Sequence, residues 1–132
     1  MGRLIESTQS RYKVAAGANI VVGDQISINA TGFAVPAPAP NTGVTGTVVG
    51  SANMNVNNTS GADGDRSVDV DHSCGYQAFL FPAGALTAAD IGKTVYVGAN
   101  PQSVSTTATN AVKSGTLQGI EDDGRARVIF TL

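Results

Sequence analysis

The residue types that could perform catalysis lie together in one short segment, Val70–Gly75, which contains the only histidine and the only cysteine of the chain. His72 stands between Asp71 and the pair Ser73 and Cys74, so a nucleophile, a base and an orienting acid are all present. The segment continues an alternating strand pattern, however, and adjacent residues of a strand point to opposite faces. Such neighbours cannot form the Ser–His or Cys–His hydrogen bond of a hydrolase. We therefore expect no catalytic residues and no enzymatic activity, and we expect Cys74 to be a small, partly buried apolar residue.

The acidic residues also lack the spacing of a known metal site. Asp63, Asp65, Asp69 and Asp71 offer oxygen ligands for Ca²⁺, but the run lacks the Gly and the Glu that an EF-hand loop places at fixed positions. One Cys and one His cannot form a four-ligand zinc site. The Gly-rich run Gly43–Gly50 has no Lys followed by Ser or Thr, as a phosphate-binding loop requires. We expect no metal and no cofactor.

Composition narrows the class of protein further. The 132 residues suffice for one domain, 42% are hydrophobic, and a net charge of −2 provides no basic surface for DNA or anionic lipid. The longest apolar stretch is about half the length needed to span a bilayer and contains a proline. Neither a nucleic acid nor a membrane is therefore expected as a direct partner. The N-terminus lacks the apolar region of a signal peptide, and one cysteine cannot form an intrachain disulfide.

The chain contains an internal repeat at an offset of 69 residues, which falls to 60 toward the end of each copy. The simplest account is a duplicated unit of about 50 residues, spanning 14–71 and 82–132, with an insertion of nine residues (69 − 60) around Ser51–Ala62 in the first copy. The matched segments are Gly23–Ile28 with Gly92–Val97, Val35 with Val104, Gly46–Gly50 with Gly115–Gly119, and Asp63–Gly64 with Asp123–Gly124.

Period-two alternation within each copy predicts half-buried β-strands, as in Gln25–Asn29, Ser67–Asp71 and Arg125–Phe130. Clusters of Gly, Asn, Asp and Pro separate the strands at the spacing of a sandwich or small barrel. Helix is expected only as a short turn over Leu86–Ile91, begun by Thr87. The predicted fold is therefore all-β: a small β-barrel or β-sandwich with a pseudo-repeated unit, in a single domain over 14–132.

Residues 1–13 precede the repeat and form a weakly basic, partly apolar arm. Arg3, Arg11 and Lys13 outnumber Glu6, for a net charge of +2, and Leu4, Ile5 and Tyr12 are interspersed. Such an arm often adds as an extra strand to the sheet edge of a neighbour, and the alternative is a frayed terminus or a first strand of the domain itself. The candidate binding residues within it are Arg3, Leu4, Ile5, Arg11 and Tyr12.

The motifs over 14–132 resemble those of capsid cement proteins, also called head decoration proteins, of tailed bacteriophages. Three segments carry the resemblance. The first is the small-residue run Ala15–Asp24, which ends in Gly-Asp, and the second is Pro82–Val97, which ends in Gly-Lys-Thr-Val-Tyr-Val. The third is Gly115–Ile120, followed by Asp123–Gly124 and a last alternating strand. The chain departs from many relatives in the loop Ser51–Ala62 and in Thr47–Gly50.

The resemblance implies a structural virion protein, made in the host cytoplasm, that binds the outer surface of the expanded head and bridges neighbouring major capsid subunits. It also implies a homo-oligomer, with a trimer favoured and a dimer possible. A carbohydrate- or surface-binding β-module of a head fibre or adhesin is the alternative, which the absence of Trp disfavours. A small hydrolase would require His72 to line a deep pocket.

Overall fold

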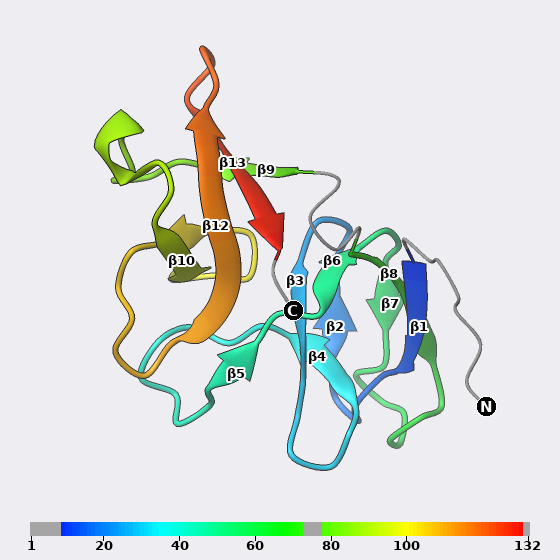
Figure 1. Ribbon diagram of the computed structural model, residues 1–132. Helices are drawn as coiled ribbons and strands as arrows, with labels where there is room; N and C mark the ends of the chain where they lie inside the picture. The colour runs from blue at the N-terminus through cyan, green and yellow to red at the C-terminus, as the bar shows by residue number, and fades with distance from the viewer. Residues whose placement is uncertain (1–8, 73–77, 131–132) are drawn as a thin grey trace, which may run out of the picture.

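Two antiparallel sheets, one from each half of the chain, make up the fold of this computed structural model, which describes residues 9–72 and 78–130 (Figure 1). The first sheet has the strand order β1-β8-β6-β3-β4. Its strands are β1 (Gln9–Lys13), β3 (Gln25–Ile28), β4 (Ala34–Pro36), β6 (Gly50–Ala52) and β8 (Ser67–Asp71). A two-stranded ribbon of β2 (Asn19–Ile20) and β7 (Val56–Asn57) accompanies it. The predicted all-β class is confirmed.

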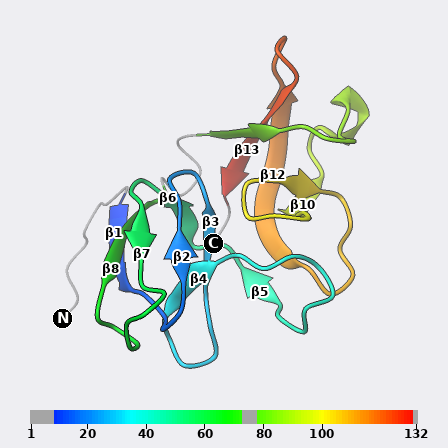
Figure 2. The same cartoon turned by 180° about the vertical axis from the view of Figure 1, so that it is seen from behind.

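The second sheet has the order β11-β10-β12-β13-β9 and takes up one further short strand, β5 (Gly46–Thr47), from the first half. Its other strands are β9 (Phe79–Pro82), β10 (Thr94–Val97), β11 (Val104–Ser105), β12 (Val112–Ile120) and β13 (Arg125–Phe130). Seen from behind, the two sheets occupy opposite sides of the molecule (Figure 2). The short 3₁₀ turn η1 (Ala88–Asp90) lies where the sequence predicts a turn, with Thr87 preceding it.

The internal repeat is a repeat of strand order and of strand pairing. Replacing β4, β3, β6, β8 and β1 by β11, β10, β12, β13 and β9 converts one sheet into the other. Asn41 and Asn110, which are 69 residues apart, both adopt left-handed backbone, and the N–H of Asn41 donates to the carbonyl of Asn110 at 2.9 Å. The two copies therefore meet at an equivalent position in each.

The register of the repeat differs from the sequence alignment in one strand. Gly50 pairs with Ile26 and Gly115 pairs with Val95, so Gly50 corresponds to Gly115 and not to Gly119. The two glycines share a steric reason: a Cβ at Gly50 would overlap the carbonyl oxygen of Asp71, and one at Gly115 would overlap that of Ile129. Both positions need glycine because the neighbouring strand approaches too closely for a side chain.

The extra residues of the first copy lie in two places. Between Ile26 and Gly50 the chain advances 24 residues, against 20 between the equivalent Val95 and Gly115. Between Gly50 and Val70 it advances 20 residues, against 13 between Gly115 and Val128. The first excess carries the chain through β5 into the second sheet, and the second excess forms β7.

Each sheet encloses its own core because alternate strand residues point inward. In β8, Val68 and Val70 are fully buried between half-exposed neighbours, as the period-two pattern predicts. The first core includes Val14, Ile20, Ile26, Val68 and Val70. The second includes Val95, Val97, Leu117, Val128 and Phe130, against which Phe79 stacks at a ring separation of 4.6 Å.

The first half also contributes to the second core. After β4 the chain continues through Pro36–Pro40, and Ala37 and Val48 are buried in the second core. The segment thus crosses from one sheet to the other and returns at β6, which is the connecting role expected of a proline-rich stretch. Within the first sheet, a parallel bridge between Val14 and Ala34 brings the end of β1 onto β4, so the sheet curls toward closure.

Candidate functional site

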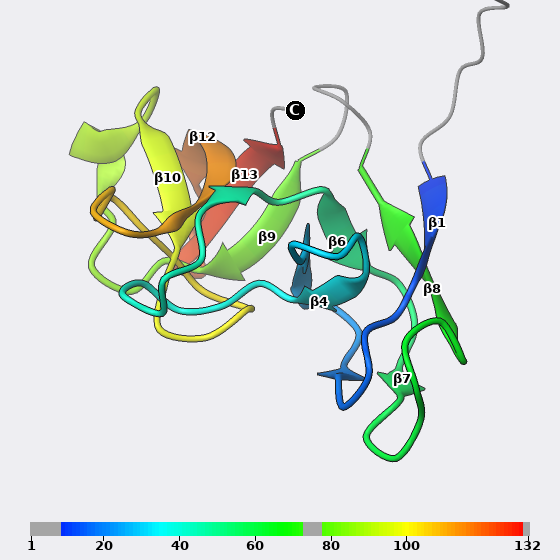
Figure 3. The same cartoon turned by 90° about the horizontal axis from the view of Figure 1, so that it is seen from below.

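The predicted binding residues Arg11 and Tyr12 lie on β1, at the outer edge of the first sheet (Figure 3). Arg3, Leu4 and Ile5 lie outside the described residues. Residues 9–13 pair along their whole length with β8, from Gln9 opposite Asp71 to Lys13 opposite Ser67. This part of the arm is therefore a first strand of the domain itself, which was one of the interpretations left open by the sequence.

Arg11 and Tyr12 point in opposite directions because they are neighbours in a strand. Tyr12 is half-buried and packs against the first core, so its ring is committed to the fold. Arg11 faces solvent with 71% of its side chain exposed. The two do not form one surface, and only Arg11 is available to a partner.

Arg11 is held in place by an ion pair with Asp69 on β8. Its Nε donates to Asp69 Oδ1 at 2.8 Å and its second guanidinium nitrogen donates to Oδ2 at 3.3 Å. The hydrogen bond from Arg11 lowers the pKa of Asp69, and the same pair raises the pKa of Arg11. The pair is exposed to water, so it orients the guanidinium more than it stabilises the fold.

The main chain of Arg11 faces the open edge of the sheet. The N–H of Val14 donates to the carbonyl of Arg66 at 2.8 Å, and hydrogen-bonded pairs alternate along an antiparallel ladder. Arg11, three residues before Val14, therefore directs its N–H and C=O away from β8. Within the described parts of the chain, β8 is the only strand that pairs with β1 along its length. Such an edge can accept a strand from another chain.

The corresponding edge strand of the second sheet is β9. Ala83 N–H donates to Gly124 O at 3.2 Å, so by the same alternation Leu80 directs its main-chain groups away from β13. Leu80 is 41% exposed, and Pro82 on the same strand has no N–H. One edge thus has a charged side chain and the other an apolar one, at equivalent positions of the repeat.

The four aspartates considered as metal ligands have separate structural roles. Asp63 accepts a hydrogen bond from Ala16 N–H at 2.7 Å, and Asp65 accepts one from Ala62 N–H at 2.8 Å. Asp69 pairs with Arg11, and Asp71 accepts from the Asn53 side chain at 3.3 Å. Among the described residues, no three His, Cys, Asp or Glu side chains gather in a way that could hold a metal ion.

A serine–histidine contact exists that the sequence analysis did not find. The hydroxyl of Ser10 on β1 lies 2.9 Å from Nε2 of His72, 62 residues later in the chain. The analysis considered only sequence neighbours of His72, and Ser73 and Cys74 lie outside the described residues. Strand pairing of β1 with β8 brings the two side chains together, so no local signal could have revealed the contact. His72 is 8% exposed.

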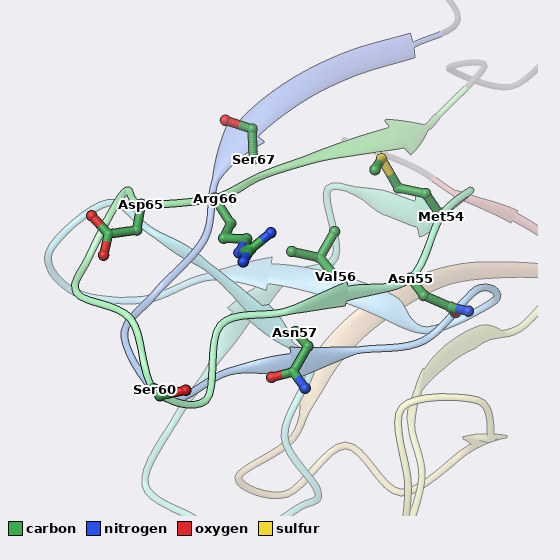
Figure 4. A pocket seen from close by; sticks show the side chains of 8 residues that line it. All are labelled: Met54, Asn55, Val56, Asn57, Ser60, Asp65, Arg66 and Ser67. Carbon is green, nitrogen blue, oxygen red and sulfur yellow. The ribbon is translucent and has the colours of Figure 1, made fainter.

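An open groove of about 540 Å³ lies between β7 and the start of β8 (Figure 4). We call it the β7–β8 groove; it is lined by Met54, Asn55, Val56, Asn57, Ser60, Asp65, Arg66 and Ser67. Its residues come from the insertion of the first copy and from the turn that follows, so the second copy has no counterpart. The sequence analysis marked the insertion as a departure from relatives but predicted no groove.

The loop between β2 and β3 presents apolar side chains from a fixed backbone. Val21 and Val22 are 46% and 52% exposed. The N–H of Val21 donates to Asp24 Oδ2 at 2.9 Å, that of Val22 donates to Asn55 Oδ1 at 2.8 Å, and the Gln102 side chain donates to Val22 O at 3.2 Å. Exposed apolar residues on an ordered loop are typical of contact surfaces.

Comparison with known proteins places the chain in no family. No family model matches it, and neither a curated protein nor a solved structure shows significant similarity. In the described part of the chain, no helix is long and apolar enough to cross a membrane.

Proposed function

We propose that this protein is a structural component of a bacteriophage virion that binds the outside of the expanded head and stabilises it by bridging neighbouring major capsid subunits. The resemblance of residues 14–132 to capsid cement proteins is the starting point for the proposal. Its structural support is the duplication: one chain carries two equivalent edge strands, β1 and β9. A bridging protein needs two contact sites, and a duplicated sheet supplies them on one chain.

Repeated weak contacts suffice for this role. Many copies on a lattice act together, so each copy needs only a modest interface. Residues 1–13 make the main attachment in this proposal, with Arg11 presented at the edge of β1 and the preceding residues adding to a capsid sheet. The protein assembles as a homo-oligomer, with a trimer favoured, at local symmetry axes of the head.

The test is co-sedimentation of the purified protein with expanded and unexpanded heads of its source phage. The informative truncation removes residues 1–8, because removal of residues 1–13 would also delete strand β1 and the packing of Tyr12. Saturable binding of the intact chain to expanded heads, lost in the truncated chain while its circular dichroism is unchanged, is the expected result. Full occupancy by the truncated chain would refute attachment through the arm. Absence of binding by the intact chain to either form of head would refute the capsid role and direct the search to glycan binding.

A further inference from the structure

The β7–β8 groove has main-chain hydrogen-bonding groups on both of its walls. On the β7 side, the N–H of Asn58 donates to Ala18 O at 2.8 Å, so by alternation Asn57 turns its N–H and C=O away from β2 and toward the groove. On the β8 side, the bond from Val14 N–H to Arg66 O means that Ser67 turns its main-chain groups away from β1, toward the same space. The groove therefore lies between two strand edges.

The β7–β8 groove arises because the chain leaves the first sheet partway along β8. Asn53 N–H still donates to Asp69 O at 3.1 Å, and Asp69 N–H meets the sulfur of Met54 at 3.5 Å. Beyond Met54 the chain joins β2 to form the separate ribbon, so the lower part of β8 has no partner on this side among the described strands. A strand position is left open next to β8.

Arg66 supplies a positive charge to this space. Figure 4 shows its side chain extending from the β8 side toward β7, whereas Asp65 points away from the guanidinium. Asp65 is already engaged by Ala62 N–H, and Arg66 makes no side-chain hydrogen bond or ion pair with the described residues. This differs from Arg11, Arg125 and Arg127, each of which is paired with an acid. An arginine left without a carboxylate in a groove favours a ligand that brings one.

Two further features favour a peptide as the ligand. The amide oxygen of Asn57 is occupied by Thr59 N–H at 3.0 Å and by the Thr59 hydroxyl, which fixes the turn after β7. Met54, 37% exposed, provides an apolar contact at the other end of the groove. Main-chain groups on both walls, a cation and an apolar end match an extended backbone with an acidic side chain.

We propose that the β7–β8 groove binds an extended peptide segment of a partner protein, which adds as a strand between β7 and β8 and places an Asp or Glu carboxylate on Arg66. This inference does not depend on the capsid role, because it concerns a surface distinct from residues 1–13. Affinity comes from the main-chain hydrogen bonds, and preference for acidic sequences comes from Arg66.

The test uses the capped peptide acetyl-Val-Thr-Glu-Thr-Val-amide and its Gln counterpart as probes. Dissociation constants and ¹⁵N chemical shifts are measured for the intact protein, for Arg66→Gln, and for Arg125→Gln as the matched control on the second sheet. We expect the Glu peptide to bind at millimolar concentration or below, to shift the amide signals of Asn57 and Ser67, and to bind about tenfold more tightly than the Gln peptide. Arg66→Gln should abolish the difference between the two peptides, and Arg125→Gln should preserve it.

Each alternative occupant has its own result. Equal binding of the two peptides by the intact protein, or no binding of either at millimolar concentration, would overturn the proposal. Binding unaffected by N-methylation of the peptide main chain, or matched by glutarate, would overturn strand addition. A peptide of residues 2–8, which contains Glu6, is included as well. Tighter binding of that peptide than of the probe would assign the groove to a second copy of this chain and overturn the assignment to a partner.

Discussion

Gln25 on β3 is a buried polar link between the two halves of the molecule. Its Nε2 group donates to the carbonyl oxygens of Pro101 at 3.2 Å and Ser103 at 2.9 Å, and its Oε1 accepts from the hydroxyl of Ser114. Gln25 and Ser114 are both fully buried. The substitution Gln25→Met keeps the length and approximate volume of the side chain but removes all three hydrogen bonds.

The cost of Gln25→Met follows from what each former partner retains. Pro101 O still accepts from Gln25 N–H and Ser103 O from Gly98 N–H, so each lost bond there costs about 1 kcal/mol. The Ser114 hydroxyl loses its buried acceptor, which costs about 1–3 kcal/mol more. Burial of a thioether in place of an amide recovers part of this sum. We expect the free energy of unfolding to fall by about 2–4 kcal/mol.

The measurement is a double-mutant cycle of Gln25→Met and Ser114→Ala by urea denaturation. Removing the Ser114 hydroxyl from the Gln25→Met chain eliminates the unpaired group, so the double variant should be about 1–2 kcal/mol more stable than the sum of the single effects predicts. Gln118→Met, at an exposed position of β12, is the control and should change the free energy by less than about 0.5 kcal/mol. Additive effects within about 0.5 kcal/mol would refute the inferred link.

The close approach at the repeated glycine and the acid titration of the η1 turn can be tested separately. Gly115→Ala should lower the free energy of unfolding by about 3 kcal/mol because its Cβ would overlap the Ile129 carbonyl. Gly43→Ala, where a Cβ has open space but φ is +81°, should cost only about 1 kcal/mol, and an equal loss in both variants would contradict the steric argument. The hydrogen bond from Thr87 N–H, and then Lys93, lowers the pKa of Asp90 below its ordinary 3.8. The contribution of Asp90 is therefore present above pH 3.8 and lost as pH falls through the lowered value, so stability should fall less steeply with acid in Asp90→Asn; parallel curves would contradict this.

Much of the fold could be predicted because it follows from local pattern. The alternation in Ser67–Asp71 and Arg125–Phe130 appears as buried and exposed residues in β8 and β13. The turn begun by Thr87 is present, and Gly92 after it adopts φ +89°. Each of these features depends on residues within a few positions of one another, where the period of side-chain direction and the backbone freedom of glycine decide the outcome.

The candidate binding residues were predicted less well. The sequence grouped Arg11 with Tyr12, but strand geometry separates a guanidinium in solvent from a ring on the core. The pairing of Ser10 with His72 and the groove at Arg66 had no local signal, since the first joins residues 62 positions apart and the second lies between strands that do not pair. The test of residues 1–8 on phage heads stays the decisive one for the predicted role.

By itself, the sequence determined the all-β class, the duplicated unit and the residues that face each core, because alternation and repetition are written along the chain. The tertiary structure alone decided that Gly50 corresponds to Gly115, that residues 9–13 are a strand, and that β7 leaves β8 to open a groove. These outcomes depend on which strands pair and in which register. Pairing is settled by side-chain packing and main-chain hydrogen bonds between segments tens of residues apart, and a sequence repeat with equally spaced glycines is consistent with more than one register.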